Sequence, residues 1–257
     1  MNDNFNNAEN QTPPEFIPQK AGGNLGLEPP LGGRGCIKGI IFDLDGTLFN
    51  TIEDIANANN AMLQNHGFPT HPIKNYIEWI GNGAGHLVRM SLPNVHANDD
   101  EKSTLYIDEY KEEYNQNLIV KTAFYKGIPE LLSFLNEMKI PLAVNTNKPH
   151  AQSLVIAEHF LKPYNFQLIQ GQKNEVPRKP DPAGANIIAQ YFACDNSEII
   201  YVGDSIVDVM TAKAAGMKMI AVEWGYGSSN EMRKAGCEQV VNSTVELKAF
   251  IEKRIMI

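Results

Sequence analysis

The sequence has few cysteines and no long apolar run. Its three cysteines, Cys36, Cys194 and Cys237, are far apart and show no spacing typical of a metal site. An odd number of separated thiols fits a reducing compartment, so we expect a cytoplasmic protein with free thiols. No apolar stretch approaches the roughly 20 residues that a membrane helix needs. Residues 1–30 lack the basic start and apolar block of a secretory signal. The sequence therefore predicts neither membrane insertion nor export.

Basic residues are also fewer than acidic residues. The chain of 257 residues carries 22 Lys and Arg against 30 Asp and Glu, which gives a net charge of -8. This balance argues against nucleic acid as a partner, because phosphate backbones bind basic surfaces. It does not exclude small phosphate esters, since a bound metal ion can supply positive charge locally. A hydrophobic fraction of 43% is enough for a globular core in one large or two small domains.

The pattern along the chain changes near Cys36. Residues 1–36 are rich in Asn, Gln, Gly and Pro, and we predict that they form a disordered tail. The following residues alternate short apolar strands with helices, which predicts an α/β fold with a Rossmann-like, doubly wound parallel sheet. Residues 52–121 interrupt this alternation with helical patterns alone. We therefore expect an all-helical insertion at 52–121 in a core made of residues 37–51 and 122–257.

Individual elements follow from the same patterns. Strands are expected at 38–43, 141–145, 168–169, 198–203, 219–222 and 239–241. Helices of the core are expected at 129–138, 151–159, 182–192, 207–215 and 244–254. Helices of the insertion are expected at 51–65, 72–80, 84–91 and 99–117.

Two carboxylates follow the first predicted strand directly. Asp43 and Asp45 are two residues apart, so their side chains project to the same side. Two unit charges about 4 Å apart cost roughly 1 kcal/mol in water and about 4 kcal/mol at an effective dielectric near 20. A fold tolerates such a pair if a cation lies between the carboxylates or if one of them holds a proton. The pair therefore indicates a metal ion, a general acid, or both.

Other polar residues follow other predicted strands. Thr146, Asn147 and Lys148 end the second strand of the core, and Asp204 ends a later one, with Asp208 four residues further. Ligands of doubly wound sheets bind at the carboxyl ends of the strands. With Lys179 from a loop before a helix, this set suits phosphoryl transfer through an aspartyl-phosphate with Mg²⁺.

Four segments of the chain resemble the motifs of a known enzyme family. The segments DLDGTL, NTNKP, KPDP and GDSIVD are similar, in order and spacing, to the four motifs of the haloacid dehalogenase-like phosphohydrolases. The helical insertion resembles the type-1 cap of that family. Within the family, YIEWIGNGAGHLV at 76–88 and WGYG at 224–227 are similar to phosphoglycolate phosphatases. The chain departs from many relatives at Asn50-Thr51, where they carry Asp-Ser. Because this position lies near the cap hinge, the resemblance does not extend to the details of the hinge.

The resemblance implies a role for each acidic residue. Asp43 would be the nucleophile and a Mg²⁺ ligand. Asp45 would be the general acid and then the general base, with its backbone carbonyl facing the metal. Asp204 would bind Mg²⁺ directly, with a helix N-cap as the alternative role. Asp208 would hold a metal-bound water or orient Lys179, which would neutralise the phosphoryl group.

Substrate contacts are implied as well. Thr146 and Asn147 would donate hydrogen bonds to the phosphoryl oxygens, although Asn147 also suits a plain turn. The backbone amides from Leu44 to Gly46 would point at the phosphate. Asn82 and Gly83 belong to a glycine-rich cap segment that is either a turn between helices or a loop that selects the leaving group.

Four further residues are placed outside the predicted site or have two possible roles. Lys148 is interpreted as an exposed lysine beside Pro149, with a second lysine of the site as the alternative. Trp79 and Trp224 are interpreted as packing residues. Arg89 is either a partner for a substrate carboxylate or a solvated helix residue.

The sequence thus predicts a Mg²⁺-dependent phosphomonoester hydrolase that acts on 2-phosphoglycolate and yields glycolate and phosphate. A phosphatase or phosphomutase of sugar phosphates or other small esters is the alternative, and a non-catalytic phosphate-binding protein is the alternative from another class. The expected partner is a small phosphorylated metabolite rather than a nucleic acid or a membrane, and the expected state is a monomer or homodimer.

Overall fold

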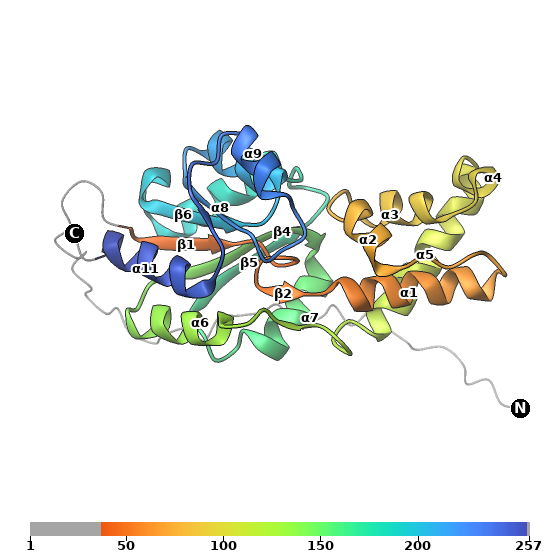
Figure 1. Ribbon diagram of the computed structural model, residues 1–257, viewed down its shortest axis with the longest axis horizontal. Helices are drawn as coiled ribbons and strands as arrows, with labels where there is room; N and C mark the ends of the chain where they lie inside the picture. The colour runs from red at the N-terminus through yellow and green to blue at the C-terminus, as the bar shows by residue number, and fades with distance from the viewer. Residues whose placement is uncertain (1–36, 256–257) are drawn as a thin grey trace, which may run out of the picture.

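Six parallel strands form the central sheet of the computed structural model, which describes residues 37–255 (Figure 1). Every neighbouring pair of these strands is parallel. The predicted tail of residues 1–36 lies outside the described residues. In order across the sheet the strands are β5 (Phe166–Gln172), β4 (Leu142–Pro149), β1 (Gly39–Phe42), β6 (Ile199–Gly203), β7 (Lys218–Val222) and β8 (Val240–Val241).

Helices cover both faces of this sheet (Figure 1). Successive residues of a strand point to opposite faces. Ile40 and Phe42 therefore join one apolar core, whereas Ile41 joins a second core on the other face. The first core is shared with α6 (Ile128–Glu137), α7 (His150–Phe160) and α11 (Thr244–Ile255), and the second with α8 (Ala183–Phe192) and α9 (Ile206–Ala215). The predicted doubly wound α/β fold is confirmed, and its doubly buried strands explain the apolar runs in the sequence.

A group of helices lies beside the carboxyl end of the sheet (Figure 1). Tyr76, Leu87 and Tyr114 are buried within this group, and Trp79 packs there as predicted. The helices are α1 (Ile52–Asn65), α2 (Ile73–Trp79), α3 (Ala84–Ser91), α4 (Asn94–Ala97) and α5 (Asp100–Gln116).

The chain enters and leaves this group through two short strands. β2 (Phe49–Asn50) pairs antiparallel with β3 (Ala123–Phe124), and the rings of Phe49 and Phe124 stack with centroids 4.6 Å apart. Asp54, buried in the first turn of α1, accepts hydrogen bonds from the backbone N–H groups of Lys121 at 2.9 Å and Thr122 at 2.7 Å. An ionised acceptor strengthens such bonds, so Asp54 fixes the exit segment against the entry helix.

Several elements differ from the sequence predictions. The strand expected at 168–169 extends over Phe166–Gln172, whose polar residues and glycine fit neither an apolar run nor a regular alternation of buried and exposed positions. The short helices α10 (Ser229–Lys234) and η1 (Asn196–Glu198), a 3₁₀ turn, were not expected. Within residues 37–255 no helix combines the length and apolar character needed to cross a membrane.

Candidate active site

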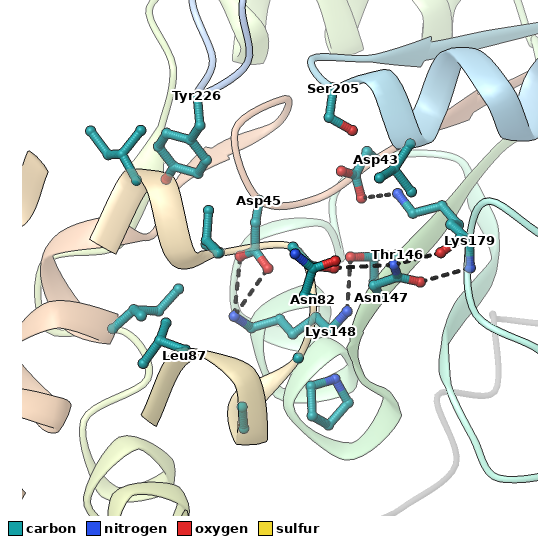
Figure 2. Close-up of a pocket in the computed structure, with 18 of the residues that line it drawn as sticks. Asp43, Asp45, Asn82, Leu87, Thr146, Asn147, Lys148, Lys179, Ser205 and Tyr226 are labelled. Carbon is teal, nitrogen blue, oxygen red and sulfur yellow. Dashed lines mark hydrogen bonds and ion pairs between the residues drawn. The ribbon is translucent and has the colours of Figure 1, made fainter. Parts of the chain in front are cut away.

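The predicted site residues meet where β1, β4 and β6 end (Figure 2). Asp43 and Asp45 follow β1, Thr146 lies in the last half of β4, and Asp204 follows β6 directly. β1 lies between the other two strands. The chain runs from β1 to β4 and β5 on one side of the sheet and then crosses to β6 on the other side, which makes this edge the topological switch point where doubly wound folds bind ligands.

Asp43 lies at the closed end of the site and is almost fully buried. The ammonium of Lys179 is 2.8 Å from its Oδ1 atom, yet this oxygen accepts no hydrogen bond. Lys179 is held in turn by Asp208, whose Oδ1 atom accepts a hydrogen bond from Nζ at 2.7 Å. Of the two roles predicted for Asp208, the orientation of Lys179 is therefore the one that matches its contacts.

Three carboxylates come close together at this point. Oxygens of Asp43, Asp204 and Asp208 all lie within 4.8 Å of one another, the one such acidic group in residues 37–255. The Asp208 carboxylate is already used by Lys179 and by the backbone N–H and hydroxyl of Ser205. Asp43 and Asp204 have fewer partners and line the cavity, whereas Asp208 does not, so these two carboxylates are the ones placed to bind a cation.

The electrostatics of these two groups favour a bound cation. Burial raises the pKa of Asp43 to about 8, and the neighbouring carboxylates add to the rise against the opposing charge of Lys179. Burial and the charge of Asp208 raise the pKa of Asp204 to about 7. A divalent ion would offset the repulsion between these carboxylates. Carboxylate oxygens are also the ligands that Mg²⁺ prefers, so this donor set fits a divalent metal.

Asp204 is oriented by two donors that hold its carboxylate in place. The Thr47 hydroxyl donates to Oδ1 at 2.9 Å, and the Tyr226 backbone N–H donates to Oδ2 at 2.7 Å. Its alternative role as a helix cap is taken by Ser205, whose hydroxyl accepts from the Asp208 backbone N–H. The side chain of Asp204 therefore faces the site rather than the helix terminus.

Asp45 lies apart from the acidic cluster (Figure 2). Its Oδ1 atom accepts a hydrogen bond from the Thr51 hydroxyl at 2.6 Å and one from Lys148 Nζ at 3.1 Å. The interpretation of Lys148 as an exposed lysine is wrong, because its side chain is only 3% exposed. The phenol of Tyr114 on α5, 34 residues earlier in the chain, covers it. The metal role predicted for Asp45 through its backbone carbonyl stays a prediction.

The turn directly after Asp45 requires glycine. Gly46 has a φ of +84°, and a Cβ atom there would run into the Asp204 carboxylate. Only glycine adopts this conformation freely and leaves that space open. The Leu44 side chain is fully buried in the core, so only its backbone can face a ligand.

Thr146 and Asn147 use their side chains differently. Thr146 Oγ1 accepts a hydrogen bond from the backbone N–H of Lys148 at 3.2 Å, which leaves its own hydroxyl proton for a ligand. The Asn147 amide binds the backbone of Lys179 in both directions, accepting at 2.9 Å and donating at 3.1 Å, and also donates to Gly81 at 3.3 Å. The prediction that Asn147 donates to phosphoryl oxygens is therefore not matched, because its amide protons already have acceptors.

The glycine-rich segment of the helical group lies over the mouth of the site. Gly81, Asn82 and Gly83 line the same cavity as Asp43, and the Asn82 carbonyl accepts a hydrogen bond from Arg178 at 3.3 Å. Arg89 instead donates to Asp100 at 2.9 Å and is absent from the lining of the cavity. Of the two roles left open for Arg89, the structure supports the solvated helix residue.

The cavity between the sheet edge and the helical group has a volume of about 230 Å³. This is smaller than the roughly 300–1,000 Å³ typical of pockets for drug-sized ligands. Its wall toward the helices is mostly apolar and includes Ile55, Ile77, Ile80, Leu87 and Tyr110. The space therefore suits a small ester whose polar end faces the carboxylates.

Four contributing residues were not predicted as site residues. Thr47 lies within the DLDGTL segment and Tyr226 within WGYG, so the motifs contained both. Tyr226 also places its hydroxyl at the start of α1, where it accepts the Thr51 backbone N–H at 2.8 Å. Thr51 was noticed only as a departure from relatives, and Tyr114 gave no signal beyond an ordinary aromatic position in a helix.

Comparisons with known proteins identify the family. Residues 40–222 match the family model of haloacid dehalogenase-like hydrolases. The phosphoglycolate phosphatase of Chromobacterium violaceum is 33% identical over 215 residues, covering 82% of this chain and 95% of its own. That of Pseudomonas syringae pv. tomato is 32% identical over 210 residues, covering 79% and 75%.

A solved structure gives the same result. The crystal structure of a predicted phosphoglycolate phosphatase from Haemophilus somnus 129pt superimposes with a TM-score of 0.78 at 26% identity, covering 85% of this chain and 99% of that chain. The fold, the four segments at the sheet edge and these matches agree. The chain therefore belongs to the haloacid dehalogenase-like hydrolase family, within which it resembles the phosphoglycolate phosphatases.

Proposed function

We propose that this protein is a Mg²⁺-dependent phosphatase that hydrolyses 2-phosphoglycolate through a phosphorylated Asp43. The observation that carries the proposal is that two aspartates at the end of the same strand have different surroundings. Asp43 lies beside Asp204 and Lys179, whereas Asp45 lies outside this cluster with other partners. One carboxylate is thus available for attack and metal binding, and the other for proton transfer.

In the first step the Asp43 carboxylate attacks phosphorus. A bond forms between a carboxylate oxygen and phosphorus, and the bond between phosphorus and the ester oxygen breaks. Asp45, in its protonated form, gives its proton to the departing oxygen, which leaves as the hydroxyl group of glycolate. The products of this step are glycolate and a phosphorylated Asp43.

In the second step water releases the phosphoryl group. Asp45 is now a carboxylate and accepts a proton from the water molecule whose oxygen attacks phosphorus. The bond between phosphorus and Asp43 breaks, which regenerates the free carboxylate and yields inorganic phosphate. Asp45 then holds the proton that the next cycle requires.

The other residues bind and orient. Lys179 lies against Asp43 and would neutralise charge on the phosphoryl oxygens, while Asp208 keeps its ammonium in position. Burial alone lowers the pKa of Lys179, but the carboxylates of Asp208 and Asp43 outweigh it and raise this pKa well above its usual value. Lys179 therefore stays cationic throughout. The Thr146 hydroxyl and the backbone from Leu44 to Gly46 would donate to the same oxygens.

Asp43 and Asp204 would hold Mg²⁺, with the backbone carbonyl of Asp45 as the further ligand predicted from the family. The ion would supply positive charge to a phosphoryl group in transfer. The choice of 2-phosphoglycolate rests on the small cavity and on relatives that carry that substrate in their names. The free thiols of Cys194 and Cys237 support a cytoplasmic location.

Phosphate release from a panel of esters tests the proposal. The panel would contain 2-phosphoglycolate, sugar phosphates and nucleotides, each with Mg²⁺ or with EDTA. We expect release only with Mg²⁺, the highest kcat/KM with 2-phosphoglycolate, and a loss of several orders of magnitude in Asp43→Asn. Release in EDTA, or turnover by Asp43→Asn, would sink the proposal. A sugar bisphosphate trapped during turnover would indicate a phosphomutase, and phosphate binding without turnover a non-catalytic protein.

A further inference from the structure

Lys148 is a buried cation to which the proposed catalytic steps give no role. It lies near the end of β4 and lines the same cavity as Asp43, and its side chain is only 3% exposed. Burial of an ammonium is costly unless partners compensate for the lost hydration. A lysine kept at this position therefore needs a reason beyond the packing of its methylene groups.

The Lys148 ammonium has two partners, Asp45 beside it at the end of the sheet (Figure 2) and Tyr114 on α5. Nζ donates to Asp45 Oδ1 at 3.1 Å and to the Tyr114 hydroxyl at 2.6 Å. The Tyr114 phenol stays neutral, because burial raises its pKa well above the usual value. An ammonium has three N–H donors, and these two partners occupy two of them. Nζ is also 3.4 Å from Asp45 Oδ2, so a ligand in the cavity would take the donor that makes this long second contact with Asp45.

We propose that Lys148 binds a carboxylate located one carbon away from the ester oxygen of the substrate. Lys148 would thus be the residue that selects a short α-phosphorylated acid over neutral phosphate esters. This inference rests on the proposed phosphatase function and extends it from the reaction to the recognition of the leaving group.

The distances around Asp45 support this placement. Asp45 must contact the ester oxygen to protonate it, at a hydrogen-bond distance of about 2.7 Å. Lys148 Nζ is 3.1 Å from the same carboxylate. In a two-carbon acid the carboxylate is separated from the ester oxygen by a single carbon, so it comes within contact distance of this ammonium. In a sugar phosphate, any second anionic group is several bonds further away and cannot reach the same point.

Among the described residues, no other cation lies where it could bind the substrate carboxylate. Lys179 is occupied by Asp43 and Asp208 at the phosphoryl end, and it is the only other lysine or arginine that lines the cavity as described. Arg89 donates to Asp100 away from the cavity. Arg178 is exposed and its guanidinium contacts the Asn82 carbonyl.

The opposite wall of the cavity has no charged group that could bind a carboxylate among the residues that line it. Ile77, Ile80 and Leu87 are apolar, and Tyr110 and Tyr114 are buried phenols. A carboxylate turned toward that wall would lose its hydration without gaining a charged partner, which is unfavourable. The charge of the leaving group is therefore directed toward Lys148.

Two substrates distinguish binding of the substrate carboxylate by Lys148 from a general contribution of this residue to activity. The first is 2-phosphoglycolate, and the second is 2-hydroxyethyl phosphate, in which a neutral hydroxymethyl group replaces the carboxylate. Lys148→Met keeps the length of the side chain and removes its charge. We expect the ratio of kcat/KM between the two substrates to fall at least about tenfold, the typical effect of losing a charged hydrogen bond, with most of the loss in KM for 2-phosphoglycolate.

A second variant and a control make the result decisive. Lys148→Gln retains hydrogen-bonding groups without the charge, and the same fall in the ratio is expected even if Lys148→Met does not fold. Arg89→Met removes a cation of the helical group that lies outside the cavity, and its ratio should equal that of the wild type. Retention of the Mg²⁺-dependent rise in melting temperature reports that each variant is folded.

Equal losses on both substrates, or an unchanged ratio, would overturn the inference and assign Lys148 a structural role. A wild-type enzyme that hydrolyses both esters with equal kcat/KM would overturn it as well, while the phosphatase proposal stands. A wild-type protein that releases phosphate from neither ester would overturn both.

Discussion

Removal of Mg²⁺ should make the stability of this protein depend strongly on pH. Burial raises the pKa of Asp43 to about 8 and that of Asp204 to about 7 in the metal-free fold, against about 3.9 for an aspartate in an unfolded chain. Between these values the folded state binds more protons than the unfolded state. Its free energy of unfolding therefore falls as pH rises. The loss begins near pH 4 and is complete slightly above pH 8.

The size of the effect follows from the same shifts. One pKa unit corresponds to about 1.4 kcal/mol, so two shifts of a few units each amount to several kcal/mol as an order of magnitude. That is a large part of the roughly 5–15 kcal/mol by which a typical protein is stable. For a chain of this size, about 1 kcal/mol changes the melting temperature by roughly 2–4 °C. We expect the metal-free protein to melt roughly 10 °C lower at pH 8.5 than at pH 5.5.

Thermal unfolding followed by circular dichroism, with Mg²⁺ or with EDTA, measures this dependence. A cation held by Asp43 and Asp204 offsets their repulsion, so the rise in melting temperature caused by Mg²⁺ should be larger at pH 8.5 than at pH 5.5. Asp204→Asn serves as the control: without metal at pH 8.5 it should melt above the wild type, and Mg²⁺ should not shift it. A flat pH dependence in EDTA, with equal Mg²⁺ effects at both pH values, would refute the reasoning.

Three substitutions test other parts of the structure. Gly46→Ala should abolish phosphate release, because a Cβ there meets a metal-site carboxylate, whereas Gly67→Ala, also at positive φ but in open space, should only lower stability by about 1–2 kcal/mol. Lys179→Met should lower the free energy of unfolding in urea by about 3–5 kcal/mol, because it leaves buried carboxylates unpaired. Adding Asp208→Asn should restore part of that stability without restoring turnover. Asp54→Ala should cost about 2–4 kcal/mol in urea, because three donors lose their acceptor.

Each of these expectations has a result that contradicts it. Turnover by Gly46→Ala near the wild-type rate would mean that the turn can shift without disturbing the metal site. A Lys179→Met protein as stable as the wild type would mean that its carboxylate partners hold protons in the fold. An Asp54→Ala protein with unchanged urea unfolding would mean that water replaces the carboxylate at the entry to the helical group.

The reactive end of the site could be predicted from the sequence because its aspartates follow strand ends and Lys179 lies in the loop before a helix of the core. Asp43, Asp204 and Lys179 lie in segments whose order and flanking apolar runs already indicate a shared sheet edge. Short-range pattern was sufficient, since a strand of four or five buried residues fixes where its last side chains point. The doubly wound sheet followed from the same alternation of strands and helices.

The distal end of the site could not be predicted in the same way. Lys148 is buried and contacts Tyr114 from a helix earlier in the chain, and no local sequence pattern indicates that contact. Asn147 was expected to bind phosphate, but its amide is used by the backbone of Lys179, which only the folded loop brings near. β2 and β3 have two residues each, which is too short for any periodicity.

The most direct test of the central claim is to trap the phosphoryl group on the protein. Enzyme mixed with Mg²⁺ and 2-phosphoglycolate would be quenched during turnover and treated with borohydride, which reduces an acyl phosphate to an alcohol. Peptide mass spectrometry then locates the reduced side chain. The account predicts reduction at Asp43 alone, and only when substrate and Mg²⁺ are both present. Reduction at another aspartate, or steady phosphate release with Asp43 never modified, would contradict it.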